Sequence, residues 1–562
     1  MRKKHKVWVY TGITALMLLY IFFNNVNLNP FYQDSAAFYA MAVTVYVVAW
    51  AIMKLGGLRL VRDGDSPHVK VVNVEFGGGK KKFPKTAIVI LAAVWIFFGG
   101  VSLFSSVLFN VNAYKNQLTE PIVGEFTEDI QPVDLENVPV VDQELAYKLA
   151  VKKLGENSSV GSQAHIDINT VTIQQVDGKL MWVAPLHHSG LFKWFANLDG
   201  SPGYITVSAS DPQDVEYRED YKIKIQPGSA YLMDDLERHT RFNAALFTGI
   251  TDYSFEIDDD GNPYWIVTTY KNRRGFSLPE ASGIVLVNAQ TGDCQKYALK
   301  DVPEWVDRVQ PEDFVINQIN NRGEYVHGFL NFSNKDKFTT SEGHIIVYND
   351  GRCYLFTGLT SVGADDSTIG FIMVDMVTKE TYQYKLGGGA TEEAAQKSAN
   401  GKVQQYGYQA SFPLIINLNN APTYFMPLKD NEGLIKQYAF VSVKNYQLVG
   451  VGETIGDAER DYMRALQSSG DNTIQPGDTT TEEQTLEGTV LRIAQEQSDG
   501  DTRYKFLLDT GDGVIFVSAA KVSDELALTQ AGDRVKVTFS GPADAVTTVT
   551  AFDNLAIGTA ES

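Results

Sequence analysis

Three long apolar runs stand at the start of the chain. Residues 7–23, 35–53 and 86–109 are runs of 17, 19 and 24 residues that contain no charged side chain. About 20 apolar residues cross the hydrocarbon core of a bilayer. The first run ends in bulky residues and asparagine instead of a small-residue cleavage site, which favours an uncleaved span over a signal peptide. The pattern predicts a membrane anchor over residues 1–110 with three transmembrane helices.

Basic residues mark one side of these predicted spans. The leader holds Arg2, Lys3, Lys4 and Lys6, and residues 54–85 hold eight lysines and arginines, whereas the loop between the first two spans holds none. Short loops rich in lysine and arginine stay in the cytoplasm. We therefore expect a multi-pass protein of a bacterial cytoplasmic membrane, with a cytoplasmic N-terminus and a large extracytoplasmic C-terminal region.

Beyond an acidic, proline-containing stalk at residues 111–141, helical and strand-like patterns alternate. Doublets typical of two-residue hairpin turns recur, at Asp177-Gly178, Asp260-Gly261, Asp350-Gly351 and Asn419-Asn420. An aromatic residue follows each turn, namely Trp182, Tyr264 with Trp265, Tyr354 and Tyr424. The recurrence predicts an α+β fold with four tandem modules, each a helix packed on an antiparallel sheet. Their expected bounds are residues 142–225, 226–308, 309–388 and 389–466.

A second apolar hairpin completes the pattern, at residues 284–292 in one copy and 371–379 in the next. The order of helix, strand, turn, aromatic strand and second hairpin resembles the PepSY-type or cystatin-like modules of bacterial membrane-anchored envelope proteins. That resemblance implies extracytoplasmic binding or regulation, often of peptidases, and brings no catalytic residues. The insertion over residues 301–342 departs from a typical single module.

The end of the chain reads as a separate domain. Residues 467–485 are rich in Ser, Gly, Asp and Thr, which predicts a flexible linker. Residues 486–562 alternate like five short strands with a helix-like segment between the third and fourth. This order resembles a small OB-fold β-barrel, and an SH3-like barrel is the alternative. With 12 acidic and 6 basic residues, this domain is not expected to bind nucleic acid.

The charge balance changes the picture further. Residues 1–110 contain 12 basic and 4 acidic side chains, which leaves 36 basic and 64 acidic for the rest, a net charge of −28. Such a charge serves solubility, or attracts cations or basic partners. The predicted spans contain no ionisable residue, and such residues usually mark ion or proton pathways. A self-contained transporter or pump is therefore not expected.

Motifs that carry chemistry are incomplete. Ser518 and Lys521 have the SxxK spacing of penicillin-interacting enzymes, but the SDN and KTG partners are missing. His187 and His188 are neighbours, so on a strand they point to opposite faces, and His188 alone remains a candidate ligand. We expect Cys294 to be an isolated thiol, as we do Cys353, although a bridge between them is the alternative. We predict no catalytic residue, cofactor or metal site.

These observations favour a noncatalytic, membrane-anchored scaffold or adaptor that presents protein- or glycan-binding modules outside the cytoplasm. Its expected partners are the membrane and an envelope protein or glycan. The candidate contact residues are Trp182, Trp194, Trp265, Trp305 and His188. One alternative is a regulator or inhibitor of an envelope peptidase. Another is an unrecognised envelope hydrolase, for which a deep cleft joining distant carboxylates to His188 would be the sign.

Overall fold

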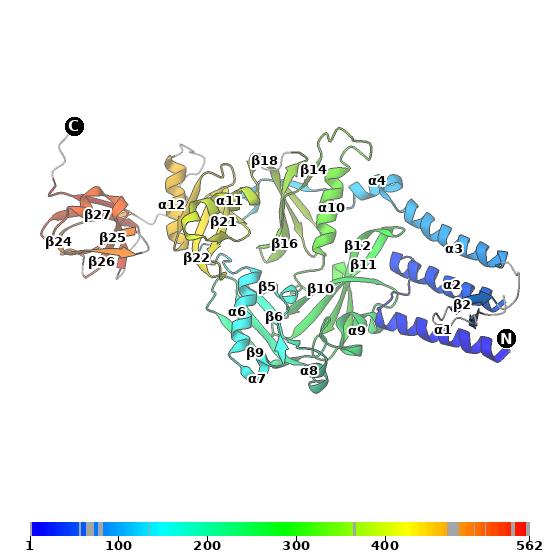
Figure 1. Cartoon of the computed structure of the whole chain (residues 1–562). Coiled ribbons are helices and arrows are strands. Elements are labelled where there is room, and N and C mark those ends of the chain that lie inside the picture. Colours follow the sequence, from blue (N-terminus) through cyan, green and yellow to red (C-terminus); the bar gives the residue numbers. More distant parts are fainter. Residues whose placement is uncertain are drawn as a thin grey trace. The chain divides into compact units, whose positions relative to one another are not determined.

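A computed structural model covers the chain and divides it into two units, Met1–Asn472 and Thr473–Ser562 (Figure 1). It describes residues 3–54, 58–62, 72–76, 83–133, 135, 137–363, 367–468, 483–498, 501–511, 513–540 and 546–557. Most of the predicted linker at 467–485 lies outside the described residues. We describe each unit by itself.

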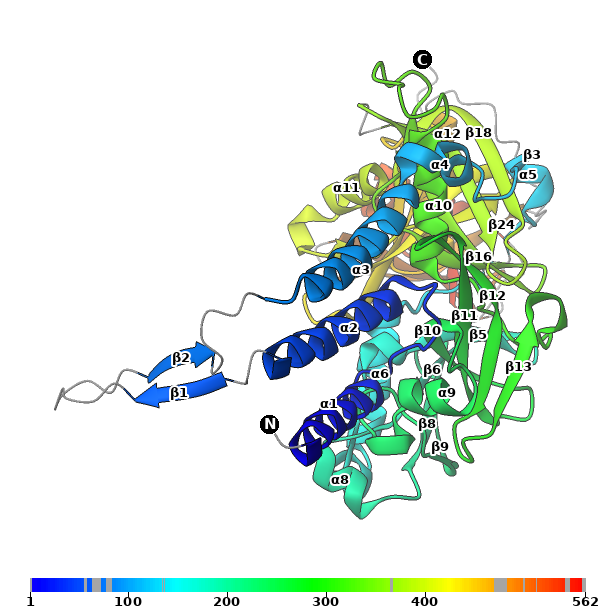
Figure 2. The same ribbon diagram turned by 90° about the vertical axis from the view of Figure 1, so that its right-hand side faces the viewer.

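The three apolar runs form three helices that are long and apolar enough to cross a membrane, as predicted. They are α1 (Lys3–Phe23), α2 (Gln33–Lys54) and α3 (Lys85–Phe104), which run side by side in Figures 1 and 2. The loop after α2 carries the hairpin of β1 (Leu58–Arg62) and β2 (Val72–Phe76).

The third helix ends earlier than the hydrophobic run. Ser105 terminates α3, and a separate helix, α4 (Val107–Lys115), follows it. The Ser105 hydroxyl donates to the Val101 carbonyl at 2.6 Å, and Asn110 donates to the Phe104 carbonyl at 2.6 Å. Polar side chains that bond to nearby carbonyls compete with the helix ladder, so a break replaces the continuous helix to residue 109 that hydropathy predicted.

Modules 1 and 2, residues 142–225 and 226–308, each contain a four-stranded antiparallel sheet. Module 1 holds α6 (Gln143–Gly155), α7 (Ser158–Gly161), α8 (Leu191–Ala196) and the small pair β4 (Ala164–His165) and β7 (His187–His188). Its main sheet is β5 (Thr172–Val176), β6 (Lys179–Pro185), β8 (Ser201–Ser208) and β9 (Val215–Ile223). Module 2 holds α9 (Leu236–Asn243) and β10 (Gly249–Ile257), β11 (Pro263–Arg274), β12 (Ser277–Asn288) and β13 (Cys294–Ala298).

Modules 3 and 4, predicted at residues 309–388 and 389–466, have larger sheets of six strands, one of them from the stalk, and five strands, and their elements run to residues 390 and 468, past the predicted bounds. Module 3 holds α10 (Glu312–Glu324) and β14 (Phe338–Thr340), β15 (Ile345–Asn349), β16 (Arg352–Ser361), β17 (Ser367–Asp375) and β18 (Thr381–Ala390). Module 4 holds α11 (Glu392–Lys402), α12 (Ile455–Ser468) and β19 (Gln409–Ala410), β20 (Leu414–Leu418), β21 (Ala421–Lys429), β22 (Ile435–Ser442) and β23 (Val449–Gly452).

The modules share their cores in pairs. One apolar cluster joins Val183 and Tyr204 of module 1 to Phe255 and Trp265 of module 2. A second cluster joins module 3 residues such as Phe371 to residues of module 4. Burial of about 25 cal/mol per Å² of apolar surface stabilises such sheet faces. Each sheet therefore depends on a neighbouring module as well as on its own helix.

The predicted stalk takes part in this architecture. Its strand β3 (Ile122–Gly124) joins the edge of module 3 in parallel with β18, and the short helix α5 (Phe126–Asp129) follows. Residues 130–133, 135 and 137–141, which we call the strap, follow, with Val138, Val140 and Val141 buried. Their apolar side chains explain why this stretch packs against the modules.

Three of the four predicted two-residue turns are confirmed. Asp177, Asp350 and Asn419 all have positive φ in the turns that join paired strands. The fourth prediction, at Asp260-Gly261, is wrong, because residues 258–262 form a longer connection between β10 and β11. There the Asp258 carboxylate accepts hydrogen bonds from the backbone N–H groups of Asp260 and Asn262, which stabilise the five-residue connection.

The second unit is one six-stranded sheet. Its strands are β24 (Glu483–Ser498), β25 (Asp501–Leu508), β26 (Ile515–Ala519), β27 (Arg534–Ser540), β28 (Val546–Thr548) and β29 (Ala551–Asn554). The order is β28-β26-β25-β24-β27-β29, and within the described residues the end strands β28 and β29 do not pair. The sheet is therefore not closed into the predicted barrel, although Phe506, Phe516 and Val537 form a buried core.

Candidate functional site

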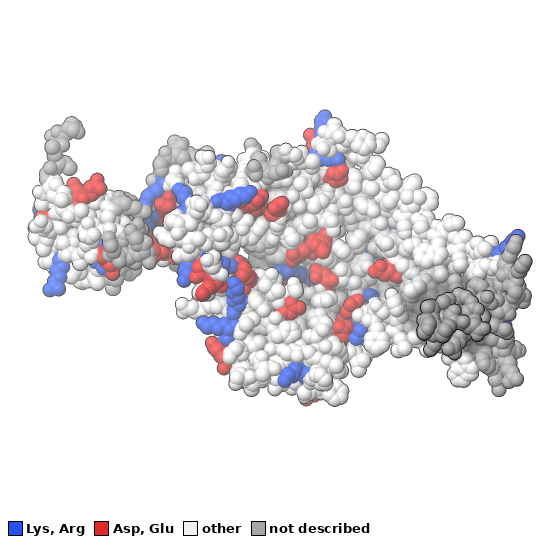
Figure 3. Space-filling model, viewed as in Figure 1, with Lys and Arg blue, Asp and Glu red and all other residues white. Residues whose placement is uncertain are grey.

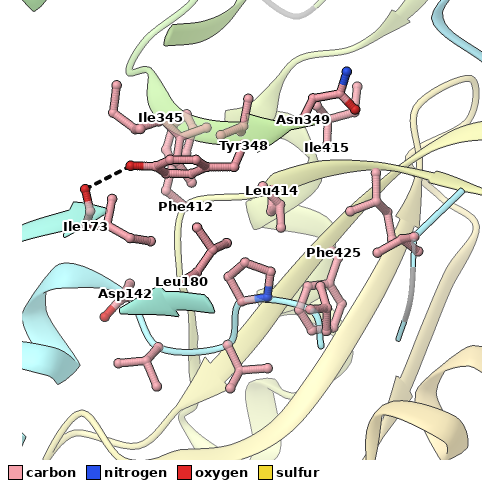
Figure 4. Close-up of a pocket in the computed structure, with 18 of the residues that line it drawn as sticks. Asp142, Ile173, Leu180, Ile345, Tyr348, Asn349, Phe412, Leu414, Ile415 and Phe425 are labelled. Carbon is pink, nitrogen blue, oxygen red and sulfur yellow. Dashed lines mark hydrogen bonds between the residues drawn. The ribbon is translucent and has the colours of Figure 1, made fainter. Parts of the chain in front are cut away.

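The main cavity of the first unit has a volume of about 650 Å³ and lies where the strap, module 1, module 3 and module 4 meet (Figure 4). Its walls are mostly apolar, with side chains that include Ile173, Leu180, Ile345, Leu414 and Ile415. The volume falls within the roughly 300–1,000 Å³ of typical ligand sites. The cavity is therefore large enough for a small molecule or a short stretch of peptide.

Strand edges border this cavity. All five residues of β15 line it, so the strand presents its backbone edge as well as its side chains. Among the described residues β15 pairs with β16 alone. At β20 the strap already occupies the edge, because Pro132 lies parallel to Asn417 and the Val133 N–H donates to the Asn417 carbonyl at 3.0 Å. Within the described residues no strand or strap segment pairs with the outer edge of β15.

Charged side chains gather at one end of the cavity. The Glu312 carboxylate accepts hydrogen bonds from Arg308 Nη1 at 3.1 Å and from His344 Nε2 at 2.7 Å. Burial acts to raise the pKa of Glu312, but the His344 hydrogen bond and the Arg308 charge outweigh it and hold that pKa below its ordinary value. Figure 3 shows Asp and Glu side chains gathered where the two pairs of modules meet.

A buried acid pair lies behind this group. The Tyr348 hydroxyl lies 3.0 Å from Asp307 Oδ2 and 3.1 Å from the Ile173 carbonyl, and the Asp307 N–H donates to Glu256 at 3.0 Å. Burial and the nearby Asp307 carboxylate raise the pKa of Glu256, and burial also raises the pKa of Asp307. The pair therefore holds a proton near neutral pH, and Tyr348 ties module 3 to module 1 across it.

This arrangement suits binding through shape and backbone pairing. Glu312 is already engaged by Arg308 and His344, and the walls are apolar. Within the described residues no group of three His, Cys, Asp or Glu side chains could hold a metal ion. The cavity is lined by the carboxylates of Glu312, Asp142 and Asp350 and by the imidazole of His344. The envelope-hydrolase alternative expected His188 beside such carboxylates, and His188 does not line this cavity.

The structure places one of the four candidate tryptophans at the cavity. Trp182 lines it half-buried, and its indole N–H donates to the Val141 carbonyl of the strap at 2.7 Å. Trp265 is fully buried in the core shared by modules 1 and 2, and its indole N–H donates to the Ile225 carbonyl at 2.8 Å. Sequence alternation alone does not tell which face of a strand turns inward.

The remaining predicted contact residues lie elsewhere. Trp194 is buried and donates to Asp234 at 3.2 Å, while Trp305 is half-buried against the Tyr264 ring at 5.2 Å. His188 is buried and does not line the cavity, and within the described residues its Nε2 has no hydrogen-bond partner. Burial lowers the pKa of His188.

Sequence reasoning missed Glu312, His344 and the open edge of β15. The only available signal was the alternating stretch before Asp350-Gly351, which predicted a strand without showing whether its outer edge was covered. Neither Cys294 nor Cys353 forms a disulfide, as expected for isolated thiols.

Comparisons with known proteins leave the function open. No protein-family model and no curated protein matches the chain. A solved structure of the Bombyx mori GH32 beta-fructofuranosidase BmSUC1 aligns at 11% identity and a TM-score of 0.18, over 72% of this chain and 69% of that one. An ACO/RPE65 chimera aligns at 8% identity and a TM-score of 0.14, over 69% of this chain and 65% of that one. Scores this low carry no argument about fold or activity.

Proposed function

We propose that the chain is a noncatalytic, membrane-anchored adaptor that binds an extended apolar segment of an envelope protein in the main cavity. The observation that carries this proposal is the open edge of β15 along an apolar cavity of about 650 Å³. A strand edge offers unpaired N–H and C=O groups to an incoming chain, and pockets for alternate side chains give specificity.

The strap supports this mode of binding. It already adds a short parallel pairing to β20 at Pro132 and Asn417, so the chain itself uses strand addition at this cavity. An incoming segment would pair with β15 and turn its apolar side chains toward Leu180 and Leu414. Glu312 and the acidic side chains nearby favour a neutral or basic segment.

The anchor completes the proposal. Three apolar helices together with the basic residues of the leader and of residues 54–85 support a bacterial cytoplasmic membrane location with the modules outside the cytoplasm. The PepSY-like order of the modules is in keeping with an extracytoplasmic binding role. The six-stranded sheet of the second unit, with its buried aromatic core, is assigned a protein partner.

The binding proposal is tested with the full chain in detergent micelles and fluorescein-labelled octapeptides that alternate Val or Leu with Thr and end in Lys. Leu180→Trp fills part of the cavity, and Leu191→Trp is the matched control, because Leu191 is exposed on α8 and does not line the cavity. We expect affinity to fall roughly tenfold or more in the first variant, which is about 1.4 kcal/mol, and to stay unchanged in the control.

Hydrogen exchange locates the peptide. Bound peptide is expected to protect the amides of β15, because strand addition pairs them. Equal binding by both variants, or protection confined to other strands, would refute strand addition at this cavity.

Orientation is tested separately in intact cells. An impermeant maleimide should label Lys152→Cys on the exposed side of α6 and spare Lys6→Cys in the leader. The reverse labelling would place the modules in the cytoplasm and remove an envelope partner from consideration.

A further inference from the structure

A second hollow of about 380 Å³ lies between α2 and α3. Tyr39, Ala40 and Val43 of α2, Val94 and Phe97 of α3, and Phe276 from the tip of the β11–β12 hairpin are among its lining residues. No charged residue lines it. Because it lies between two helices apolar enough to span a bilayer, its natural contents are hydrocarbon.

The hairpin tip is fixed at the mouth of this hollow, which we call the interhelix cleft. The Phe276 N–H donates to Ser105 Oγ at 3.0 Å, and the Phe276 ring lies 5.7 Å from that of Phe98. Gly275 has a φ of +52°, and a Cβ there would stand 2.1 Å from Ser105 Oγ, so any side chain would be strained and would displace the Ser105 hydroxyl. Figure 1 shows the β11–β12 hairpin reaching the ends of α2 and α3.

The end of β11 carries three exposed cations, Lys271, Arg273 and Arg274. Lys271 and Arg273 lie on the face of the strand that carries Glu280, which pairs with Arg273 at 3.1 Å and lies opposite Lys271. Arg274 points to the other face, next to Gly275 of the tip, and the described part of the chain supplies no ion-pair partner for it. Arg274 Nη1 donates to the Arg273 carbonyl at 3.2 Å. One uncompensated cation thus stands at the hairpin tip whose Phe276 lines the apolar cleft.

We propose that the interhelix cleft holds an acyl chain of an anionic phospholipid whose headgroup phosphate binds Arg274. The apolar walls require hydrocarbon, and each buried methylene contributes about 0.8 kcal/mol. The Arg274 guanidinium requires an anion in the headgroup layer, where lysine and arginine attract anionic lipid. This site is separate from the main cavity and stands whichever side of the membrane the modules occupy.

The test uses the full chain and native mass spectrometry after exchange into detergent micelles that contain equal amounts of phosphatidylglycerol and phosphatidylcholine. We expect phosphatidylglycerol to be retained in preference to phosphatidylcholine. Arg274→Gln should reduce that preference roughly fivefold. Lys152→Gln, which removes one exposed cation on α6, should leave it unchanged.

A second variant tests the acyl chain. Ala93→Trp places a bulky side chain in the cleft, and we expect it to reduce retention of both lipids at least roughly threefold, because a filled cleft forfeits the buried methylenes. Equal retention of the two lipids by the wild-type chain would overturn the proposal. So would a preference that survives Arg274→Gln, or lipid retention unchanged by Ala93→Trp.

Discussion

Replacing Trp265 with phenylalanine separates a core role from a binding role. Trp265 is fully buried, its indole N–H donates to the Ile225 carbonyl at 2.8 Å, and its ring lies 5.0 Å from that of Phe255. Phenylalanine lacks the donor and leaves the buried carbonyl unpaired, at a cost of about 1–3 kcal/mol. The smaller ring adds a cavity that costs about 1 kcal/mol more. We therefore expect Trp265→Phe to destabilise module 2 by about 2–4 kcal/mol.

The two native cysteines report on this loss separately. Cys294 packs against the apolar cluster that contains Trp265, whereas Cys353 belongs to a different cluster in module 3. Cys294 is half-buried, and the population in which local opening exposes it fully rises exponentially as the free energy of opening falls. Since each 1.4 kcal/mol is a factor of ten, a loss of 2 kcal/mol should speed the maleimide labelling of Cys294 that depends on opening roughly 30-fold.

The assay is a labelling time course on the full chain at constant pH, with each cysteine resolved by peptide mass spectrometry. Labelling of Cys353 should change less than about threefold, because modules 1 and 2 form a core of their own. An unchanged Cys294 rate, together with loss of ligand binding, would refute the core assignment of Trp265. Equal acceleration at both cysteines would refute the separation into paired cores.

Three further outcomes follow from buried groups. Burial raises the pKa of Glu256, so the folded state keeps a proton that the unfolded chain releases above about pH 4.5. The stability of the folded state should therefore fall as the pH rises from there, and Glu256→Gln should flatten the dependence of Tm on pH. A Cβ on Gly450 would stand 2.1 Å from the Tyr462 nitrogen, so Gly450→Val should loosen α12 by about 1–3 kcal/mol, measured by hydrogen exchange of that helix. The Asp142 carboxylate caps α6 and also pairs with Lys429. Asp142→Asn keeps a capping side chain, so Asp142→Ala should destabilise α6 by about 1 kcal/mol more than Asp142→Asn. The urea dependence of amide hydrogen exchange in α6 measures the difference.

Local patterns in the sequence determined the elements that depend on near neighbours. The apolar runs predicted three long helices, because hydrophobic length alone fixes what a bilayer can hold. The doublets at Asp177 and Asp350 predicted tight turns, because aspartate and glycine tolerate positive φ. The early end of α3 at Ser105 was missed because hydropathy does not register hydrogen bonds back to the helix backbone.

Only the tertiary structure decided the features that join distant parts of the chain. The fold buries Trp265 in the core shared by modules 1 and 2 and places Trp182 at the cavity, although both residues follow a predicted turn at the same distance in sequence. It also laid residues 122–124 against β18 and left one edge of β15 uncovered. Sequence alone determined what each segment forms, whereas the partner of each face and edge depends on packing among residues hundreds of positions apart, which no local periodicity records.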